Sequence, residues 1–456
     1  MIDFFGLANI TSDELNALSS QEISALLGFS QTPKYPSQLI NLDRFSESEE
    51  MIAAVTYVYA QLQKEGVLGS YRETGFKNHL NIILSNLRHV DYVFPRYWLR
   101  YSRVKAYYSK IGFYYSFGSS CTYLVAVIDG LESIGLVEGI RGFKNPKTGI
   151  GKQSRIRPKP ALLDIFDYFG VTPDKVTSRP KQKLIQLKDT DGKLIEYEDT
   201  EQTIEMHRQL VAYNELLARA DIELHIPESD LESALALKVN PIDQSAKYYH
   251  RVFREGSFEH LGRFYGPWWQ NLSSDLRSHI LINNRETTEL DYSALHVHLL
   301  YSEMKLHYWD LFDPLDDPYM LSGYCTKSRD VLKKAFLIWL NNTNRHTADK
   351  AIIDKLMELG IYEKGMDLDG TFDGFTTKHP AISDYLLAGQ GLHFQYLDSL
   401  ITERIVSWSI KFGIPILGIH DSFIVSRPKK FLLKQIMKYA FVERNLKSIP
   451  KIKTVY

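Results

Sequence analysis

The feature that most restricts the fold of this chain is a short hairpin signal near its C-terminus. Two apolar runs, residues 414–419 and 422–425, are interrupted only by His420 and Asp421. A two-residue interruption between β-prone runs is typical of a tight antiparallel hairpin, so we expect a β-sheet with Asp421 at the end of a strand. Amphipathic helix patterns precede and follow this hairpin, which together predict an α+β fold.

A second β-prone run ends in an acid far upstream in the sequence. Residues 287–291 read Thr-Thr-Glu-Leu-Asp, and helical spacing follows them. Two aspartates at the ends of neighbouring strands can hold the two divalent ions, ~3.5–4 Å apart, that phosphoryl transfer to a 3′-hydroxyl requires. Mg²⁺ suits such a site, with Mn²⁺ as a substitute, because it binds a few carboxylates together with phosphate and water oxygens. Taken alone, either Asp291 or Asp421 would more often be a turn former or a helix cap.

A helix pattern lies between these two acids. Every fourth residue of this pattern falls on one face, which carries Arg329, Lys333, Leu337 and Asn341. Two cations at one end of the face can bind a triphosphate while a base stacks further along. A basic, solvated face of an amphipathic helix is the commoner explanation when such a pattern stands alone.

Taken in order, the three elements resemble motifs A, B and C of a known polymerase superfamily, the one that joins family A DNA polymerases to the phage and mitochondrial single-subunit RNA polymerases. Asp291-Tyr292-Ser293 is similar to the motif A sequence, and His420-Asp421 is similar to motif C. Upstream, Gly262-Arg263 and Gln270-Asn271 resemble pairs that precede motif A in family A enzymes. The resemblance covers about residues 250–430. It implies a reduced right-hand polymerase with an antiparallel-sheet palm, helical fingers, a short thumb and no exonuclease.

The resemblance also implies roles for individual residues. Asp291 and Asp421 would be the metal ligands, joined by a backbone carbonyl of Leu290 or Tyr292, and Lys333 would be a catalytic proton donor. The implied nucleotide-binding residues are Arg329, Lys333, Leu337, Asn341, Tyr292 and His296. The implied nucleic-acid-binding residues are Gly262, Arg263, Gln270, Asn271, Gln395 and His420.

Two departures from the family pattern concern the choice between ribonucleotides and deoxyribonucleotides. His296 stands where the DNA enzymes carry a Glu that excludes a ribose 2′-hydroxyl, and Asn341 stands where the family places a Tyr. Leu337 and the sequence His-Asp-Ser-Phe favour the RNA enzymes, whereas the upstream Gly-Arg and Gln-Asn pairs favour the DNA enzymes. The expected partners are nucleoside triphosphates, a DNA template and an RNA product or primer.

Four functions remain open at this point. The chain could synthesise or prime RNA on a DNA template, or it could be a small family A-like DNA polymerase without proofreading. A template-independent nucleotidyltransferase would also tolerate Asn341. From another class, the polymerase fold could be the inactive scaffold of a DNA-binding replication initiator. Two buried aspartates beside Lys333 and Arg329 argue against an inactive scaffold, because like charges are unfavourable in a protein interior without a metal.

The N-terminal part predicts a second nucleic-acid-binding element. Three helix patterns, residues 79–90, 97–111 and 119–135, precede a hairpin with a long tip, which is the order of a winged helix. The hairpin carries cations and no acid, namely Arg141, Lys144, Lys147, Lys152, Arg155, Arg157 and Lys159. Such a wing can lie along phosphates, and with a net charge of −1 any such contact must be local. A solvated hairpin, or a winged helix that contacts protein, is the alternative.

The sequence predicts four parts and few other sites. The parts are a helical segment over 1–73, a winged-helix domain over 74–175, a linker and short thumb over 176–250, and a palm-and-fingers domain over 251–456. No apolar run reaches ~18 residues and no signal peptide is evident, so we expect a cytoplasmic protein with no membrane contact. Cys121 and Cys325 lack metal or disulfide spacing.

Several other polar residues are expected to be structural. His296 and His298 lack a third metal ligand, so zinc is not expected. Asp398 and Glu403 are expected to form structural hydrogen bonds within a helix. Turn formation is the expected role of Asp313, Asp316 and Asp317.

Overall fold

The computed structural model describes residues 36–456, except for residues 95–96, 110–111, 115–119, 145–150, 178–180, 182, 227–241, 322–325 and 364. The chain forms two compact units that alternate along the sequence. Unit 1 comprises residues 1–184, 222–250 and 266–280, and unit 2 comprises residues 185–221, 251–265 and 281–456. The predicted division into four parts stays a prediction.

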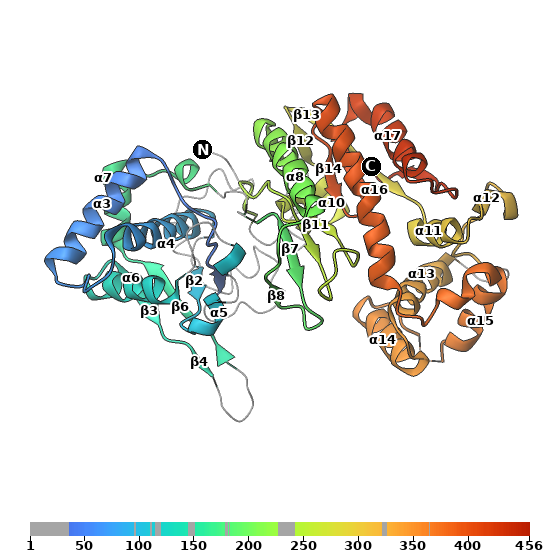
Figure 1. Ribbon diagram of the computed structural model, residues 1–456, viewed down its shortest axis with the longest axis horizontal. Helices are drawn as coiled ribbons and strands as arrows, with labels where there is room; N and C mark the ends of the chain where they lie inside the picture. The colour runs from blue at the N-terminus through green and yellow to red at the C-terminus, as the bar shows by residue number, and fades with distance from the viewer. Residues whose placement is uncertain are drawn as a thin grey trace. The chain divides into compact units, whose positions relative to one another are not determined.

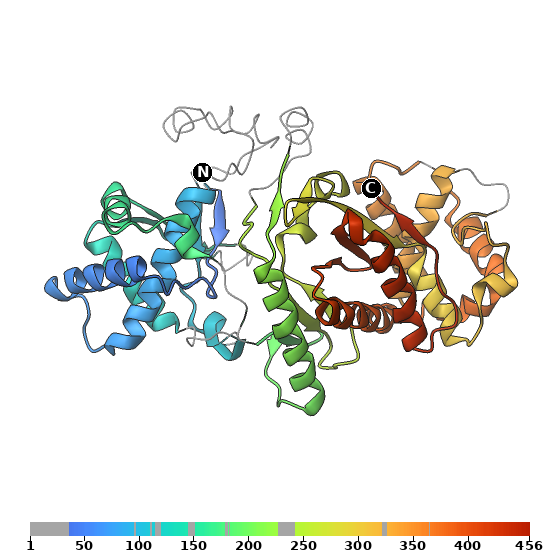
Figure 2. The ribbon, with the colours of Figure 1, turned by 90° about the horizontal axis from the view of Figure 1, so that it is seen from above.

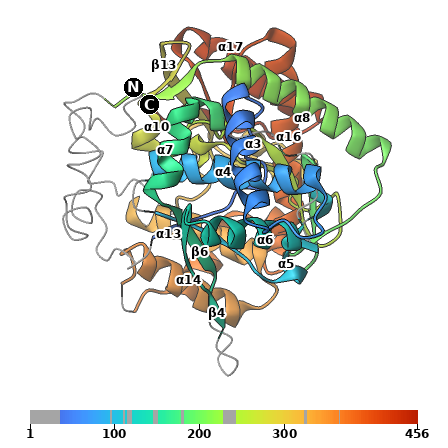
Figure 3. The ribbon, with the colours of Figure 1, turned by 90° about the vertical axis from the view of Figure 1, so that its left-hand side faces the viewer.

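Unit 1 is built mainly from helices around an apolar core. Its described helices are α3 (Glu49–Lys64), α4 (Glu73–Val93), α5 (Lys105–Ser109), α6 (Cys121–Ser133), α7 (Pro160–Phe169) and α10 (Ser274–Arg277), with 3₁₀ turns η1 (Gly112–Tyr114), η2 (Pro173–Val176) and η4 (Trp268–Asn271). Its described strands are β1 (Ser37–Leu39), β2 (Trp98–Tyr101), β3 (Val137–Ile140), β4 (Phe143–Lys144), β5 (Gly151–Lys152), β6 (Ser154–Pro158) and β9 (Ile222–Leu224). Helix α4 packs against both α3 and α6, and β6 contacts α4 (Figure 3).

The helix α6 begins where the sequence predicts. The side chain of Ser120 accepts a hydrogen bond from the backbone N–H of Tyr123, which satisfies one of the free donors of the first turn. The second predicted helix, residues 97–111, is wrong in its first half. Residues 98–101 form β2, which pairs in parallel with β1 and antiparallel with β6. Large aromatic residues such as Trp98 and Tyr101 fit a pleated, half-buried surface, and pairing on both edges fixes the strand.

The expected hairpin of unit 1 is present. β3 and β6 pair antiparallel, with Gly139 opposite Ile156, and β4 and β5 extend the hairpin toward its tip. From α4 onward the elements follow the order helix, strand, helix, helix, strand, strand, and the sheet order is β1-β2-β6-β3. Lys147 lies outside the described residues.

Unit 2 contains two sheets and a group of helices. Its described helices are α8 (Glu201–Arg219), α11 (Leu295–Glu303), α12 (Tyr308–Leu311), α13 (Thr326–Asn341), α14 (Arg345–Glu358), α15 (Leu368–Lys378), α16 (Gly391–Phe412) and α17 (Lys430–Glu443), with 3₁₀ turns η5 (Pro380–Tyr385) and η6 (Arg427–Lys429). Its described strands are β7 (Ile185–Lys188), β8 (Leu194–Ile195), β10 (His250–Phe253), β11 (Arg263–Tyr265), β12 (Ile280–Ile282), β13 (Arg285–Tyr292), β14 (Leu417–Ile419), β15 (Ser422–Ser426) and β16 (Ile452–Thr454). The chain is thus α+β, as predicted.

The antiparallel sheet around β13 confirms the hairpin predicted at His420 and Asp421. β14 and β15 pair with Ile419 opposite Ser422, so His420 and Asp421 form the turn between the two strands. β15 then pairs with β13, which places Ser422 opposite Asp291. The C-terminal strand β16 pairs with β13 from the other side. Two strand ends that lie 130 residues apart in the sequence therefore meet at one edge of the sheet.

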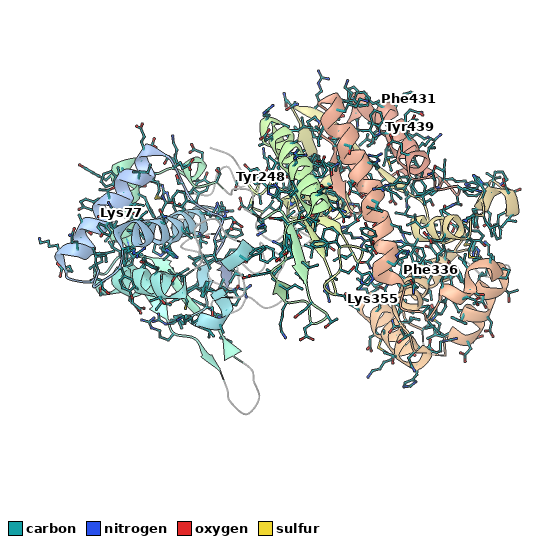
Figure 4. All side chains as sticks on the ribbon, in the orientation of Figure 1. Lys77, Tyr248, Phe336, Lys355, Phe431 and Tyr439 are labelled. Atoms are coloured by element: carbon teal, nitrogen blue, oxygen red, sulfur yellow. The ribbon has the colours of Figure 1, made fainter. Side chains whose placement is uncertain are left out.

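The helix α16 connects the parts of unit 2. Figure 1 shows it running from the helices α13 to α15 at one end to β14 and α17 at the other. Helix α17, dark red in Figure 2, contacts β13 and β15. The core of unit 2 includes Phe336 of α13, which is fully buried and labelled in Figure 4. The second sheet, ordered β11-β10-β7-β8, contains an antiparallel hairpin of β7 and β8 that turns through Asp191 and Gly192.

In the part of the chain that the structure describes, no helix combines the length and the hydropathy that crossing a bilayer requires.

Candidate active site

Two aspartates stand at adjacent strand ends in unit 2. Asp291 lies near the end of β13, and Asp421 lies in the turn that leads into β15. His420 adopts a left-handed conformation with φ of 58°, which lets the chain reverse within two residues. The Ser422 hydroxyl donates a hydrogen bond to the carboxylate of Glu289 over 2.7 Å. This bond joins the turn to β13 in addition to the backbone pairing of β13 with β15.

The charges of these two aspartates affect each other. Burial raises the pKa of Asp291 to about 6, and the negative charge of Asp421 adds to this effect, while Lys453 and Lys333 oppose it. The side chain of Asp291 is 18% exposed. Two partly buried like charges without a cation between them are unfavourable, which is the electrostatic condition that a divalent ion relieves.

Two lysines approach the aspartates. Lys333 of α13 interacts electrostatically with both carboxylates, and its pKa is lowered mainly by burial and further by Lys453. Lys453 of β16 places its Nζ 3.0 Å from Oδ2 of Asp291. The sequence indicated Lys333 through its helical spacing. Lys453 was missed, because only the pairing of the C-terminal strand with β13 brings it to the site.

A buried ion pair lies beside Asp421. Arg263 of β11 donates from Nε and Nη2 to Oδ2 of Asp398, over 3.0 and 2.7 Å. Asp398 on α16 is 2% exposed. The guanidinium of Arg263 is thus paired with this carboxylate, and its predicted contact with a template or primer backbone stays a prediction. The structural role predicted for Asp398 is confirmed by the same pair.

His296 belongs to the same group of charges. Burial lowers its pKa, and the carboxylates of Asp398 and Asp421 oppose that shift. The imidazole of His296 is therefore held within electrostatic range of Asp421, Arg263 and Lys333. Its predicted place near the incoming nucleotide stays a prediction.

Gly262 has a packing role that differs from the predicted nucleic-acid contact. Its φ is 61°, and a Cβ there would lie 2.6 Å from Oγ of Ser399 on α16. Its carbonyl accepts a hydrogen bond from Nε of Arg251 over 2.8 Å. Glycine is needed here because the backbone approaches the helix too closely for a side chain. The predicted contact of Gly262 with nucleic acid stays a prediction.

The predicted face of α13 reaches the site only in its middle. Arg329 donates from Nε to Oδ2 of Asp317 over 2.6 Å, and Asp317 also accepts from the backbone of Tyr319, as expected of a turn former. Leu337 is half-buried, and Asn341 is exposed and donates to the Leu337 carbonyl. Arg329 and Asn341 are about 18 Å apart along the helix. Lys333, between Arg329 and Asn341 on this face, lies within electrostatic range of both aspartates.

Other predicted residues have mixed outcomes. The hydroxyl of Tyr292 is buried and donates to the Met437 carbonyl over 2.6 Å, so only its backbone remains for the predicted site. The Nδ1 atom of His420 is buried without a hydrogen-bond partner, and its ring lies edge-on to Tyr265 with centroids 5.4 Å apart. Gln395 is half-buried on α16.

Two predicted residues fall in the other unit. Gln270 and Asn271 lie on η4 of unit 1, and the Gln270 side chain accepts a hydrogen bond from the backbone of Gly266. Their contact with nucleic acid therefore stays a prediction.

The wing of unit 1 is less cationic than its sequence suggests. Arg141 pairs with Asp129 over 2.8 Å and with Glu132 over 2.7 Å, both on α6. Arg157 pairs with Glu138 and lies over the Trp98 ring. These acids are outside residues 141–159, so the count of charges within that stretch could not reveal them. Lys152 is exposed and Arg155 half-buried, and the side chains of Lys144 and Lys147 lie outside the described residues.

Among known proteins, the chain has similarity to solved structures. No family model matches the chain, and no curated protein matches it. Among solved structures, the chain is similar to the POL domain of Pol1 from M. smegmatis in a complex with DNA primer-template and dNTP. The identity is 13% and the TM-score is 0.27, and the match covers 87% of this chain and 71% of that one.

Proposed function

We propose that the chain is a template-directed nucleotide polymerase, with Asp291 and Asp421 as the ligands of its catalytic Mg²⁺. One observation carries this proposal. The register of β13 against β15 sets the two carboxylates at neighbouring strand ends, close enough for Asp421 to raise the pKa of Asp291. Lys333 reaches both of them from a helix that lies between them in the sequence.

The residues present fit a divalent ion. Asp291 and Asp421 would hold Mg²⁺, or Mn²⁺ in its place, and phosphate and water oxygens would complete its coordination. Among the described residues, no group of three or more His, Cys, Asp or Glu side chains is arranged to bind a metal. When bound, the ions would activate a 3′-hydroxyl and stabilise the leaving pyrophosphate.

The cations of the site would bind the substrate. Lys333 has a pKa lowered mainly by burial, so it holds its proton less tightly and can give it to the pyrophosphate oxygen. Arg329 forms a partly exposed ion pair with Asp317. A triphosphate would compete with the Asp317 carboxylate for the Arg329 guanidinium. Exchange of one partially solvated partner for another has a small net free energy.

The preference for ribonucleotides and the type of template are proposed from the sequence. His296 in place of a Glu, and Asn341 in place of a Tyr, favour use of ribonucleotides for RNA synthesis or priming on a DNA template. The alternative is a small DNA polymerase without proofreading. The helix and strand order of unit 1 is that of a winged helix, which supports binding of DNA by that unit.

A second candidate is an inactive DNA-binding replication initiator. The observation that favours it is the Lys453 ammonium, which lies 3.0 Å from Asp291 and neutralises a carboxylate that a polymerase needs for metal. The two candidates predict opposite results in one assay.

Extension assays on primed and unprimed templates, with ribonucleotides and deoxyribonucleotides offered separately in Mg²⁺, distinguish them. We expect wild-type extension, and a loss of roughly 10³-fold in Asp421→Asn and Asp291→Asn, because each change removes a metal ligand. Asp354→Asn is the matched control, since this exposed acid lies on α14 of the same unit. If folded wild type and Asp421→Asn are equally inactive with every template and nucleotide, the initiator is the better assignment.

A further inference from the structure

The last strand of the chain carries a cation to the candidate metal site. β16 pairs antiparallel with β13, and Lys453 is directly opposite Asp291. Directly opposite residues of an antiparallel pair point to the same face of the sheet. The Nζ of Lys453 accordingly lies 3.0 Å from Oδ2 of Asp291.

The backbone fixes this contact. Ser293 N–H donates to the Lys451 carbonyl, and Val455 N–H donates to the Glu289 carbonyl, each over 2.8 Å. The Thr288 hydroxyl donates to the carbonyl of Tyr456 over 2.7 Å. A slip of β16 by one residue would turn Lys453 to the other face of the sheet. The hydrogen bonds on both sides of Lys453 prevent such a slip and so keep Lys453 opposite Asp291.

The charges of the site balance without metal. The carboxylates of Asp291 and Asp421 are matched by the ammonium groups of Lys333 and Lys453, and each lysine interacts with the Asp291 carboxylate. A divalent ion bound at Asp291 would face the Lys453 ammonium at short range. Like charges at that separation repel strongly, so the ion and the ammonium exclude each other.

We propose that Lys453 is the resting counter-ion of Asp291, and that a divalent ion must displace it to bind. The C-terminal strand thereby sets the metal concentration that the site requires. This inference rests on the metal site of the proposed function. Lys453 is 51% exposed, and its flexible stem lets the ammonium move into water while β16 stays paired.

Binding of Mn²⁺ to the full-length, metal-free protein tests this. Electron paramagnetic resonance measures the free Mn²⁺. Binding at the candidate site is the part of the total Mn²⁺ binding that is lost in Asp291→Asn. We expect Lys453→Met to bind that Mn²⁺ roughly two- to tenfold more tightly than wild type, because the competing ammonium is gone. Lys453→Arg keeps the charge and should stay near wild type.

Lys451→Met is the matched control. It removes one positive charge from the segment that leads into β16, but the Lys451 ammonium lies over the Trp309 ring at 4.7 Å and contacts no carboxylate in the described structure. We expect its Mn²⁺ affinity to equal that of wild type. A general effect of surface charge would instead tighten binding in both methionine variants, and that result would overturn the inference.

The remaining outcomes separate the inference from the proposed function. If Lys453 only stabilised β16, Lys453→Met would loosen the site and weaken Mn²⁺ binding, which is the opposite sign. Equal or weaker binding by Lys453→Met, with wild-type binding that depends on Asp291, overturns the inference and leaves the metal site in place. Absence of Asp291-dependent binding in wild type and in Lys453→Met overturns both.

Discussion

The carboxyl group of Asp291, the proposed metal ligand, weakens the fold that carries it. Its pKa is raised to about 6 by burial and by Asp421, so its charged form is disfavoured in the folded state even with Lys453 beside it. The folded protein therefore binds more protons than the unfolded chain between about pH 4 and 6, and stability falls as the pH rises through this range. Above about pH 6 the carboxyl group is ionised in both states, and the full free-energy penalty of burying its charge remains.

Asp291→Asn should consequently stabilise the metal-free protein at pH 7.5, by about 1–3 kcal/mol in the free energy of unfolding, while it abolishes metal binding. The gain should shrink to below about 1 kcal/mol by pH 4, where the carboxyl group of wild type is protonated in the folded state and partly protonated in the unfolded chain. Urea unfolding at the two pH values measures this. Added Mg²⁺ should raise the stability of wild type only. A variant that is less stable than wild type at pH 7.5 would contradict the assignment.

At the scale of elements, α16 positions more of the site than its sequence indicated. Asp398 on this helix holds Arg263, and the Thr402 hydroxyl donates to the carbonyl of His420 in the turn before Asp421. Glu403 pairs with the fully buried Arg251, which in turn donates to the Gly262 carbonyl. The segment Gly262-Arg263 and the turn at His420 are thus both fixed to one helix.

Gly262→Ala tests this close approach. The added Cβ would meet Oγ of Ser399 at 2.6 Å, so we expect a loss of about 2–4 kcal/mol in unfolding free energy and a displaced Arg263. Gly256→Ala is the matched control, because its φ of 66° imposes similar backbone strain while its Cβ would meet only Ile195, at 3.9 Å. Gly256→Ala should lose about 1 kcal/mol. Equal losses in the two variants, measured by thermal or urea unfolding, would show that α16 does not constrain residue 262.

At the scale of the whole molecule, two separate apolar cores support the two units. The core of unit 1 includes Leu87 of α4, and that of unit 2 includes Leu433 of α17, each at most 1% exposed. Leu87→Ala should destabilise unit 1 by about 2–5 kcal/mol through loss of packing and a cavity. Hydrogen exchange followed by mass spectrometry should then speed up in α4 and α6 and stay unchanged in β13 and α16.

Leu433→Ala is the reciprocal variant. It should speed exchange in β13, α16 and α17 and leave α4 and α6 unchanged. Faster exchange throughout the chain in either variant would mean that the two units unfold as one.

The sequence by itself determined the features that depend on neighbouring residues. The apolar runs around His420 and Asp421 specified a hairpin, and the spacing of residues 329–341 specified a helix with Lys333 in the middle of one face. Ser120 marked the start of α6. Periodicity and capping act over a few residues, so one sequence suffices to read them. The second predicted helix failed where pairing with β1 and β6 overrode local propensity.

Only the tertiary structure decided which charges meet. Lys453 reaches Asp291 across a strand pair, and Asp398 and Asp317 pair with the two arginines that were expected to be free for nucleic acid or triphosphate. Acids on α6 and β3 likewise neutralise two cations of the wing. Register and packing between distant segments set these distances, and Coulomb energy depends on distance and burial rather than on position in the sequence. The aspartates and Lys333 could therefore be found from the sequence, but Lys453 and the partners of the two arginines could not.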